Sequence, residues 1–159
     1  MRQPTKGRQG SKEVMITSRA VIVAVLTLSL QLRAFAQSSP ATAPPVALKG
    51  YDPVSYFDPG KPAKGVSTID YDFDGMRYLF VSQKNRELFA GNPDRYSPQF
   101  RGLCTTGVSM GVKAGADPNI FLVKDGKLYV FSDIESRAMV EKDPTLLTKA
   151  HQAWGQLKK

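Results

Sequence analysis

The pattern of apolar and polar residues occurs twice in this chain, at an offset of 51 positions. Residues 71–96 read YDFDGMRYLFVSQKNRELFAGNPDRY, and residues 122–147 read LVKDGKLYVFSDIESRAMVEKDPTLL. Each copy carries an Asp-Gly pair between β-branched and aromatic residues, which favours a two-residue hairpin turn. A pattern with helical spacing follows in each copy. The sequence therefore predicts two antiparallel β-hairpin–helix units.

The two predicted helices begin at recognisable caps. Ser82 is expected to cap the first helix, which ends near the Gly-Asn-Pro sequence at 91–93. Ser132 or Asp133 is expected to cap the second helix. The side chains expected to face the core are Leu88 and Phe89 in the first helix, and Ile134, Met139 and Val140 in the second.

A third helix is predicted over residues 144–157. Asp143 is expected at its N-cap and Pro144 at its first position, where the missing N–H of a proline removes no helical hydrogen bond. One apolar stripe, with mostly three- and four-residue steps, is formed by Leu146, Leu147, Ala150, Trp154 and Leu157. We expect Trp154 to anchor this helix onto the sheet as a core residue.

These elements indicate the fold class. Two hairpins, each followed by a short helix, predict a small single α+β domain with a C-terminal amphipathic helix, rather than alternating parallel units. The repeated pattern either records a duplication or reflects two units that obey the same local rules. The sequence leaves both interpretations open.

The first 36 residues have the pattern of a secretory signal peptide. A basic stretch that ends at Arg19 precedes an apolar run over residues 20–30, and small residues at Ala34 and Ala36 form a cleavage pattern. We expect cleavage after Ala36 and a periplasmic or secreted protein, with no stable membrane span after cleavage. The apolar run is shorter than the roughly 20 residues that span a bilayer. Translation from Met15 and an uncleaved membrane anchor are the alternatives.

The charge of the chain changes once the signal peptide is set aside. The whole chain has 22 Lys and Arg against 14 Asp and Glu, a net charge of +8. Six of those basic residues and one acidic residue lie in 1–36, which leaves 16 and 13, a net charge of +3. This balance, without a basic stripe, excludes nucleic acid as an expected partner. Residues 37–45 are expected to form a disordered leader, and residues 46–159 to form the domain.

Cys104 is the only cysteine in the sequence. A single thiol excludes intramolecular disulfides and sites built from several thiolates. Two interpretations stay open. Cys104 is either a buried small apolar residue, or a soft metal ligand together with Met110 and, if the fold brings it near, His151, a set that suits Cu(I). Arg101 is expected to lower the pKa of the thiol if its side chain points toward it.

The carboxylates offer weaker candidates. Asp70, Asp72 and Asp74 alternate along a predicted strand and therefore share one face. A solvated strand face is favoured over a calcium site, because the rest of an EF-hand loop is missing. Asp52 precedes Pro53 in a predicted turn, where it is expected to cap its own backbone. A single histidine gives no convincing Ser-His-Asp arrangement, so the sequence favours a protein that is not an enzyme.

Residues 46–159 resemble the exported YHS-domain proteins of bacteria. The resemblance rests on ALKGYDPVSYF at 47–57, YLFVS at 78–82, NPDRY at 92–96, PQFRGLC at 98–104 and DGKLY at 125–129. It implies a small α+β module of a kind found beside heavy-metal transporters and linked to metal binding.

The chain departs from this family at several positions. Metal-associated relatives carry cysteines where this chain has Ser55, Val81 and Asn85. Exported relatives carry their cysteine in a different segment, usually Tyr-Gly-Gly-Tyr-Cys-Ala, which here reads FRGLCT. The resemblance therefore directs any metal chemistry to Cys104.

Together, the residues and the resemblance predict an exported, non-enzymatic binding module for a soft metal such as copper. Its candidate metal ligands are Cys104, Met110 and His151. The alternative is a structural or protein-interaction module with a buried, inert Cys104. A metal ion or a periplasmic protein is the expected partner.

Overall fold

The structure is a computed structural model that describes residues 42–57 and 61–159. Residues 43–159 form one unit. The predicted signal peptide and most of the predicted leader lie outside the described residues. Pro45 already contacts the hairpin of the first half, because its carbonyl accepts a hydrogen bond from Arg77 N at 2.9 Å. Within the described part of the chain, no helix combines the length and the apolar character that a membrane crossing requires.

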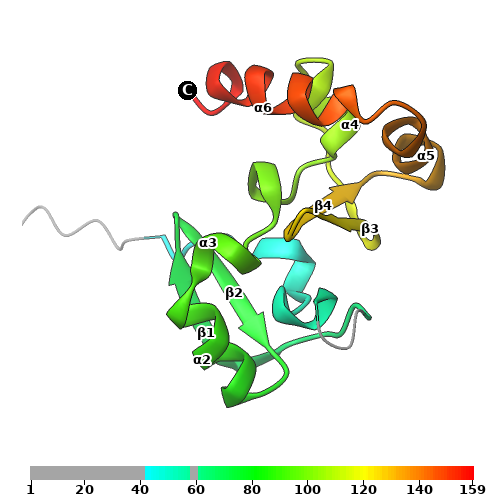
Figure 1. The fold of residues 1–159 in the computed structure, drawn as a ribbon. Coiled ribbons are helices and arrows are strands. Elements are labelled where there is room, and N and C mark those ends of the chain that lie inside the picture. Colours follow the sequence, from blue (N-terminus) through cyan, green and yellow to red (C-terminus); the bar gives the residue numbers. More distant parts are fainter. Residues whose placement is uncertain (1–41, 58–60) are drawn as a thin grey trace, which may run out of the picture. The chain divides into compact units, whose positions relative to one another are not determined.

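Each half of this unit contains an antiparallel hairpin followed by a helix (Figure 1). The first half contains η1 (Ala47–Gly50), η2 (Val54–Tyr56), β1 (Val66–Phe73), β2 (Met76–Phe80), α2 (Gln83–Gly91) and α3 (Pro93–Tyr96). The second half contains η3 (Gln99–Gly102), α4 (Thr105–Ser109), β3 (Asp117–Lys124), β4 (Lys127–Phe131), α5 (Ile134–Lys142) and α6 (Thr145–Leu157). The predicted α+β architecture is confirmed.

The two hairpins have the same register and the same turn. Val66 pairs with Phe80 in the first hairpin and Asp117 with Phe131 in the second, and both ladders shift register just after these pairs. The turn residues have positive φ throughout: 47° and 71° at Asp74 and Gly75, and 51° and 71° at Asp125 and Gly126. Positive φ at both central positions matches the twist of the flanking strands. The predicted two-residue turns are therefore confirmed.

The repeat extends beyond the hairpins. The last three residues of η1 and of η3 have positive φ, at an offset of 52: Leu48, Lys49 and Gly50, then Phe100, Arg101 and Gly102. This conformation costs a non-glycine residue roughly 1–2 kcal/mol, so local preference does not explain it. The isolated bridges correspond as well, Val46–Arg77 with Pro98–Leu128 and Tyr51–Lys64 with Leu103–Gly115. This shared geometry favours a duplication over a coincidence of local rules.

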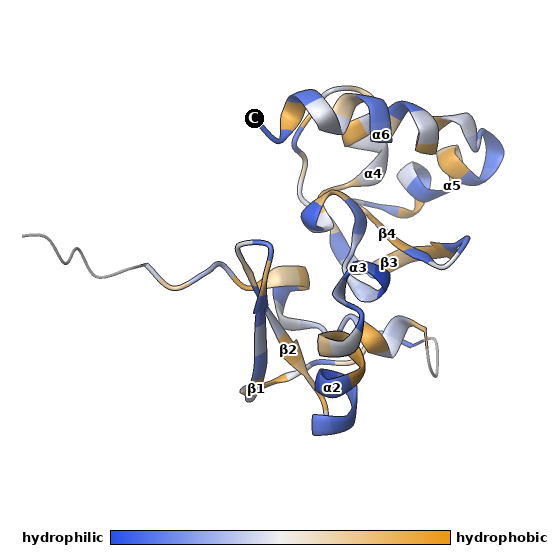
Figure 2. Ribbon diagram, turned by 60° about the vertical axis from the view of Figure 1, so that its left-hand side comes forward, coloured by the Kyte–Doolittle hydropathy of each residue, from blue (hydrophilic) through white to orange (hydrophobic). Residues whose placement is uncertain are grey.

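Each hairpin buries a narrow stripe of its helix. Phe89 in α2 is 0% exposed, and Val140 at the equivalent position of α5 is 1% exposed. Leu88, Ile134 and Met139 are instead 43%, 70% and 43% exposed, so the prediction that they face the core is wrong. A short helix over a two-stranded hairpin meets too little sheet to bury a broad face. Figure 2 shows much of α2 as hydrophilic and β4 as hydrophobic.

The helix caps follow the sequence closely. Ser82 Oγ accepts a hydrogen bond from Asn85 N at 3.2 Å, as expected. In the second unit the N-cap is Asp133 rather than Ser132, and its Oδ1 accepts from Ser136 N at 2.6 Å.

Helix α6 begins one residue later than predicted. Pro144 occupies its N-cap, while Asp143 Oδ1 accepts a hydrogen bond from Thr145 N at 3.1 Å. Helix α6 packs chiefly against α4, with Leu147 and Ala150 buried in the core. Its aromatic contacts are with Phe100 of η3, whose ring centroid lies 5.9 Å from that of Trp154, and with Tyr129 of β4 through His151.

Candidate functional site

Cys104 lies between η3 and α4 and is 1% exposed. Its backbone N–H donates to the Ala114 carbonyl at 2.9 Å, and its backbone pairs with Val130 of β4. Its Sγ lies 3.3 Å from Ser132 Oγ. The thiol is therefore held inside the second unit, at the end of its hairpin.

Hydrogen bonding sets the acidity of this thiol. Burial raises the pKa of Cys104, because the thiolate loses hydration. The Ser132 hydroxyl and the backbone N–H groups of Gly107, Ser132 and Thr106 lower it by more, so the net shift of the pKa is downward. Arg101 takes no part, since its Nε and Nη2 both donate to the Asp74 carboxylate at 3.0 Å. The condition for an effect of Arg101 on the thiol pKa, a side chain that points toward Cys104, is therefore not met.

Cys104 is the repeat equivalent of Asp52, at the offset that relates η1 to η3. Asp52 is 0% exposed. Its carboxylate accepts hydrogen bonds from Val54 N at 2.8 Å, from Val81 N at 2.9 Å and from Asn85 Nδ2 at 2.8 Å. The bond from Val54 N confirms the predicted capping of its own turn. The long-range bonds tie that turn to β2 and α2.

The groups around Cys104 correspond to those around Asp52. Thr106 and Ser132, whose N–H groups lower the thiol pKa, are the equivalents of Val54 and Val81. These N–H groups come from two separate segments of each unit and converge on one side chain, an arrangement that favours an anionic group; we call it a nest. Each unit therefore contains an equivalent nest, which holds a carboxylate in the first unit and a thiol in the second.

The other two candidate metal ligands have different surroundings. Met110 is 60% exposed at the C-cap of α4. His151 Nε2 lies 3.3 Å from the Tyr129 hydroxyl, and its ring centroid lies 5.0 Å from that of Phe100. Burial lowers the pKa of His151, with a smaller contribution from Lys127. None of these contacts joins two of the three candidate ligands.

Other metal ligands are also dispersed. Within residues 42–57 and 61–159, no group of three or more His, Cys, Asp and Glu side chains lies close enough together to hold a metal ion. Arg77 Nε lies 3.3 Å from Asp70 Oδ2 and 2.9 Å from Asp72 Oδ1, on an exposed strand face. These carboxylates therefore serve a surface ion-pair network.

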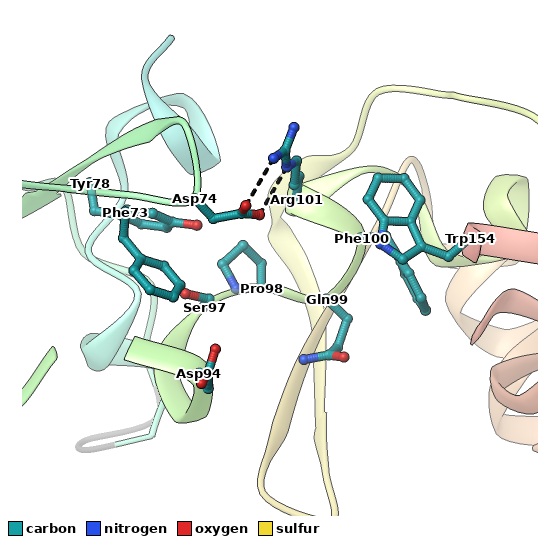
Figure 3. Close-up of a pocket in the computed structure, with 10 residues that line it drawn as sticks. All are labelled: Phe73, Asp74, Tyr78, Asp94, Ser97, Pro98, Gln99, Phe100, Arg101 and Trp154. Atoms are coloured by element: carbon teal, nitrogen blue, oxygen red, sulfur yellow. Dashed lines mark hydrogen bonds and ion pairs between the residues drawn. The ribbon is translucent and has the colours of Figure 1, made fainter. Parts of the chain in front are cut away.

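A cleft of about 450 Å³ was not anticipated from the sequence. We call it the aromatic cleft. It is lined by Phe73, Asp74, Tyr78, Asp94, Ser97, Pro98, Gln99, Phe100, Arg101 and Trp154. The hairpin β1–β2 and the segment around α3 form one side, and Phe100 and Trp154 lie on the other (Figure 3). Its volume falls in the range of small-molecule sites.

Two hydroxyl groups lie on the first side of the aromatic cleft, beside the rings of Phe73 and Pro98 (Figure 3). Ser97 Oγ is buried and has no hydrogen-bond partner among the described residues. It lies near the Tyr78 hydroxyl without meeting it in hydrogen-bond geometry. Burial raises the pKa of Tyr78, and the nearby Ser97 hydroxyl lowers it in part. The Tyr78 phenol is therefore neutral at pH 7, and Ser97 Oγ lies beneath the surface of the cleft wall, beside that phenol.

An ion pair borders the aromatic cleft. Asp74, in the turn of β1–β2, pairs with Arg101 of η3, and the dashed lines in Figure 3 mark the two contacts. The hydrogen bonds from Arg101 lower the pKa of Asp74. This pair joins the first unit to the second beside the cleft.

Sequence reasoning missed the aromatic cleft because its walls come from three distant stretches, 73–78, 94–101 and 154. The signal available was Trp154, which we interpreted as core. Trp154 does pack against the core cluster, beside Phe100, and it also forms part of a wall of the cleft.

Comparisons of the chain with known protein families, with curated proteins and with solved structures found no match. The resemblance to exported YHS-domain proteins therefore stays a prediction from the sequence.

Proposed function

We propose that residues 43–159 form a non-enzymatic binding module that holds a small organic molecule in the aromatic cleft, with Cys104 as a core residue. The observation that carries this proposal is the cleft itself, about 450 Å³ in volume, with aromatic rings, Asp94 and Gln99 among its lining residues.

The composition of the cleft supports binding rather than catalysis. Aromatic side chains supply contact area, and a few polar groups supply orientation, which is the usual make-up of a ligand site. The protein's only thiol and its only histidine have separate partners, Ser132 for Cys104 and Tyr129 for His151. The described residues therefore present no paired thiol and imidazole for nucleophilic catalysis.

The second candidate function is that of an exported YHS-like module that binds a soft metal at Cys104. One observation favours it, the lowered pKa of the thiol, since the thiolate is the form that binds metal. The repeat offers a structural explanation for the lowered pKa of Cys104. The first unit contains an equivalent nest of N–H groups, and there it holds the Asp52 carboxylate. We therefore rank the metal site second.

The first proposal is tested by screening a mixed set of neutral, cationic and anionic fragments against the purified protein, with ¹H–¹⁵N NMR as the readout. Trp154 is the only tryptophan, so its indole N–H resonance reports on the cleft without ambiguity. We expect some fragments to shift this resonance and those of Ser97 and Gln99. If no fragment shifts them, the proposed site is wrong.

The ranking of the two candidates is tested with a thiol reagent and with Cu(I) under reducing conditions. A core Cys104 reacts only as fast as the domain unfolds, and Cu(I) binds equally weakly to the wild type and to Cys104→Ser. Rapid labelling of the native protein, or Cu(I) binding that Cys104→Ser abolishes, would reverse the ranking.

A further inference from the structure

Among the charged residues that line the aromatic cleft, some form an ion pair with each other and one does not. Of the residues that line it, Asp74 and Asp94 are acidic and Arg101 alone is basic. Arg101 is committed to Asp74 through two hydrogen bonds of 3.0 Å. The charge of Lys158, which does not line the cleft, also lowers the pKa of Asp74. Because Asp74 is paired with Arg101, Asp94 is the acidic lining residue to which Arg101 does not bond.

Asp94 has no ion pair within the described part of the chain. The neighbouring guanidinium of Arg95 lies over the ring of Tyr96, 5.5 Å from its centroid, rather than on the carboxylate. In the view of Figure 3, Asp94 and the Gln99 amide lie below the Asp74–Arg101 pair. A carboxylate and an amide oxygen in this position both accept hydrogen bonds from a donor group.

The aromatic walls also favour positive charge. The faces of Phe, Tyr and Trp rings attract an ammonium group through their quadrupole, most strongly for Trp. Phe73 and Trp154 are partly exposed and line the cleft from opposite sides. An anionic ligand would meet Asp94 without a free cation, because the basic group of the cleft already bonds Asp74.

We propose that the aromatic cleft selects a small organic ammonium ion, with Asp94 as its counter-ion, the Gln99 amide oxygen as a hydrogen-bond acceptor, and Phe73 and Trp154 as the apolar and cation–π faces. This inference rests on the proposed function and adds the chemical class of the ligand. A neutral polyhydroxyl ligand is the competing class, because it would use the same polar groups without needing the charge of Asp94.

The test uses three probes of nearly equal shape: phenethylamine, 2-phenylethanol and 3-phenylpropanoate. They carry a cation, a neutral hydroxyl and an anion on the same phenylethyl body. Each is titrated into the purified protein at pH 7 and followed by Trp154 fluorescence and by its indole N–H resonance. We expect phenethylamine to bind about tenfold more tightly than 2-phenylethanol, and 3-phenylpropanoate to bind most weakly.

Two matched variants assign the selectivity. Asp94→Asn keeps the shape of the side chain and removes its charge, and we expect it to bring phenethylamine and 2-phenylethanol to within about twofold of each other. Asp125→Asn makes the same change in the turn of β3–β4, outside the cleft, and we expect it to preserve the preference.

The failures of the two proposals are distinguishable. Equal binding of the amine and the alcohol to the wild type would overturn the charge selectivity while leaving the cleft as a binding site. A preference that survives Asp94→Asn would overturn the role of Asp94. If Asp125→Asn also lost the preference, the selectivity would depend on the net charge of the protein rather than on Asp94, and the inference would be overturned. Silence of all three probes would overturn it too, and the wider fragment screen then decides whether the cleft binds anything.

Discussion

Cys104 and Asp52 occupy equivalent buried positions and accept hydrogen bonds there through different groups, a thiol and a carboxylate. Each sits where N–H groups converge at the end of a hairpin, and each is almost completely buried. Asp52 satisfies its nest with hydrogen bonds from Val54, Val81 and Asn85. Cys104 offers a weaker acceptor to an equivalent nest. The lowered pKa of the thiol follows from this environment and needs no metal.

The lowered thiol pKa makes stability depend on pH in a specific direction. Because the pKa of Cys104 is lower in the folded state than in the unfolded chain, ionised Cys104 stabilises the fold. That contribution is fully present above the ordinary thiol pKa of about 8.5, and is lost as pH falls through the folded-state pKa. We expect the free energy of unfolding of the wild type, relative to Cys104→Ser, to increase from pH 7 to about pH 8.5 and then to level off toward pH 10.

Urea unfolding of both proteins across this pH range measures that difference. The tyrosines with raised pKa values, including Tyr78 and Tyr129, destabilise both proteins equally at high pH and cancel in the comparison. A difference that stays constant, or that shrinks as pH rises, would contradict the ionised-thiol account.

At the scale of single elements, α2 and α5 each bury one residue, Phe89 and Val140, rather than a broad apolar face. In α5 the neighbours Met139 and Val140 are 43% and 1% exposed. Val140 packs in the core cluster with Leu128, Val130 and Phe131. Residue type alone would rank methionine as the larger loss, since it has more apolar surface. Burial reverses that order.

Alanine substitutions test this reversal. We expect Val140→Ala to lower the free energy of unfolding by about 2 kcal/mol, because two buried methyl groups and their packing are lost. Met139→Ala should cost less than about 0.5 kcal/mol, as is usual for an exposed site. Chemical denaturation of the two variants gives both values. A larger loss for Met139→Ala would place the wrong face of α5 against the hairpin.

At the scale of the whole molecule, the architecture is one hairpin–helix unit used twice, with α6 added at the end. The units share hairpin register, turn geometry, isolated bridges and left-handed residues in η1 and η3. They differ in chemistry at equivalent positions. Asp52 and Asn85 in the first unit become Cys104 and Ser136 in the second, which is how one scaffold holds two kinds of buried group.

A transplant tests whether the units are interchangeable at this point. Cys104→Asp alone buries a carboxylate with too few donors, whereas Cys104→Asp with Ser136→Asn restores the pair found in the first unit. We expect Ser136→Asn to stabilise the Cys104→Asp background by about 1 kcal/mol relative to its effect on the wild type. The double-mutant cycle is measured by urea unfolding. Additive effects would mean that the two nests are not equivalent.

The sequence alone determined the local features of this protein. The Asp-Gly turns, the cap at Ser82 and the hairpin–helix order all follow from interactions within a few residues. Only the tertiary structure decided which helix face is buried, because that depends on how much sheet each helix meets. It also decided that Arg101 bonds Asp74 rather than Cys104, and that Trp154 faces a cleft. These outcomes depend on contacts between residues far apart in the chain, which no local pattern specifies.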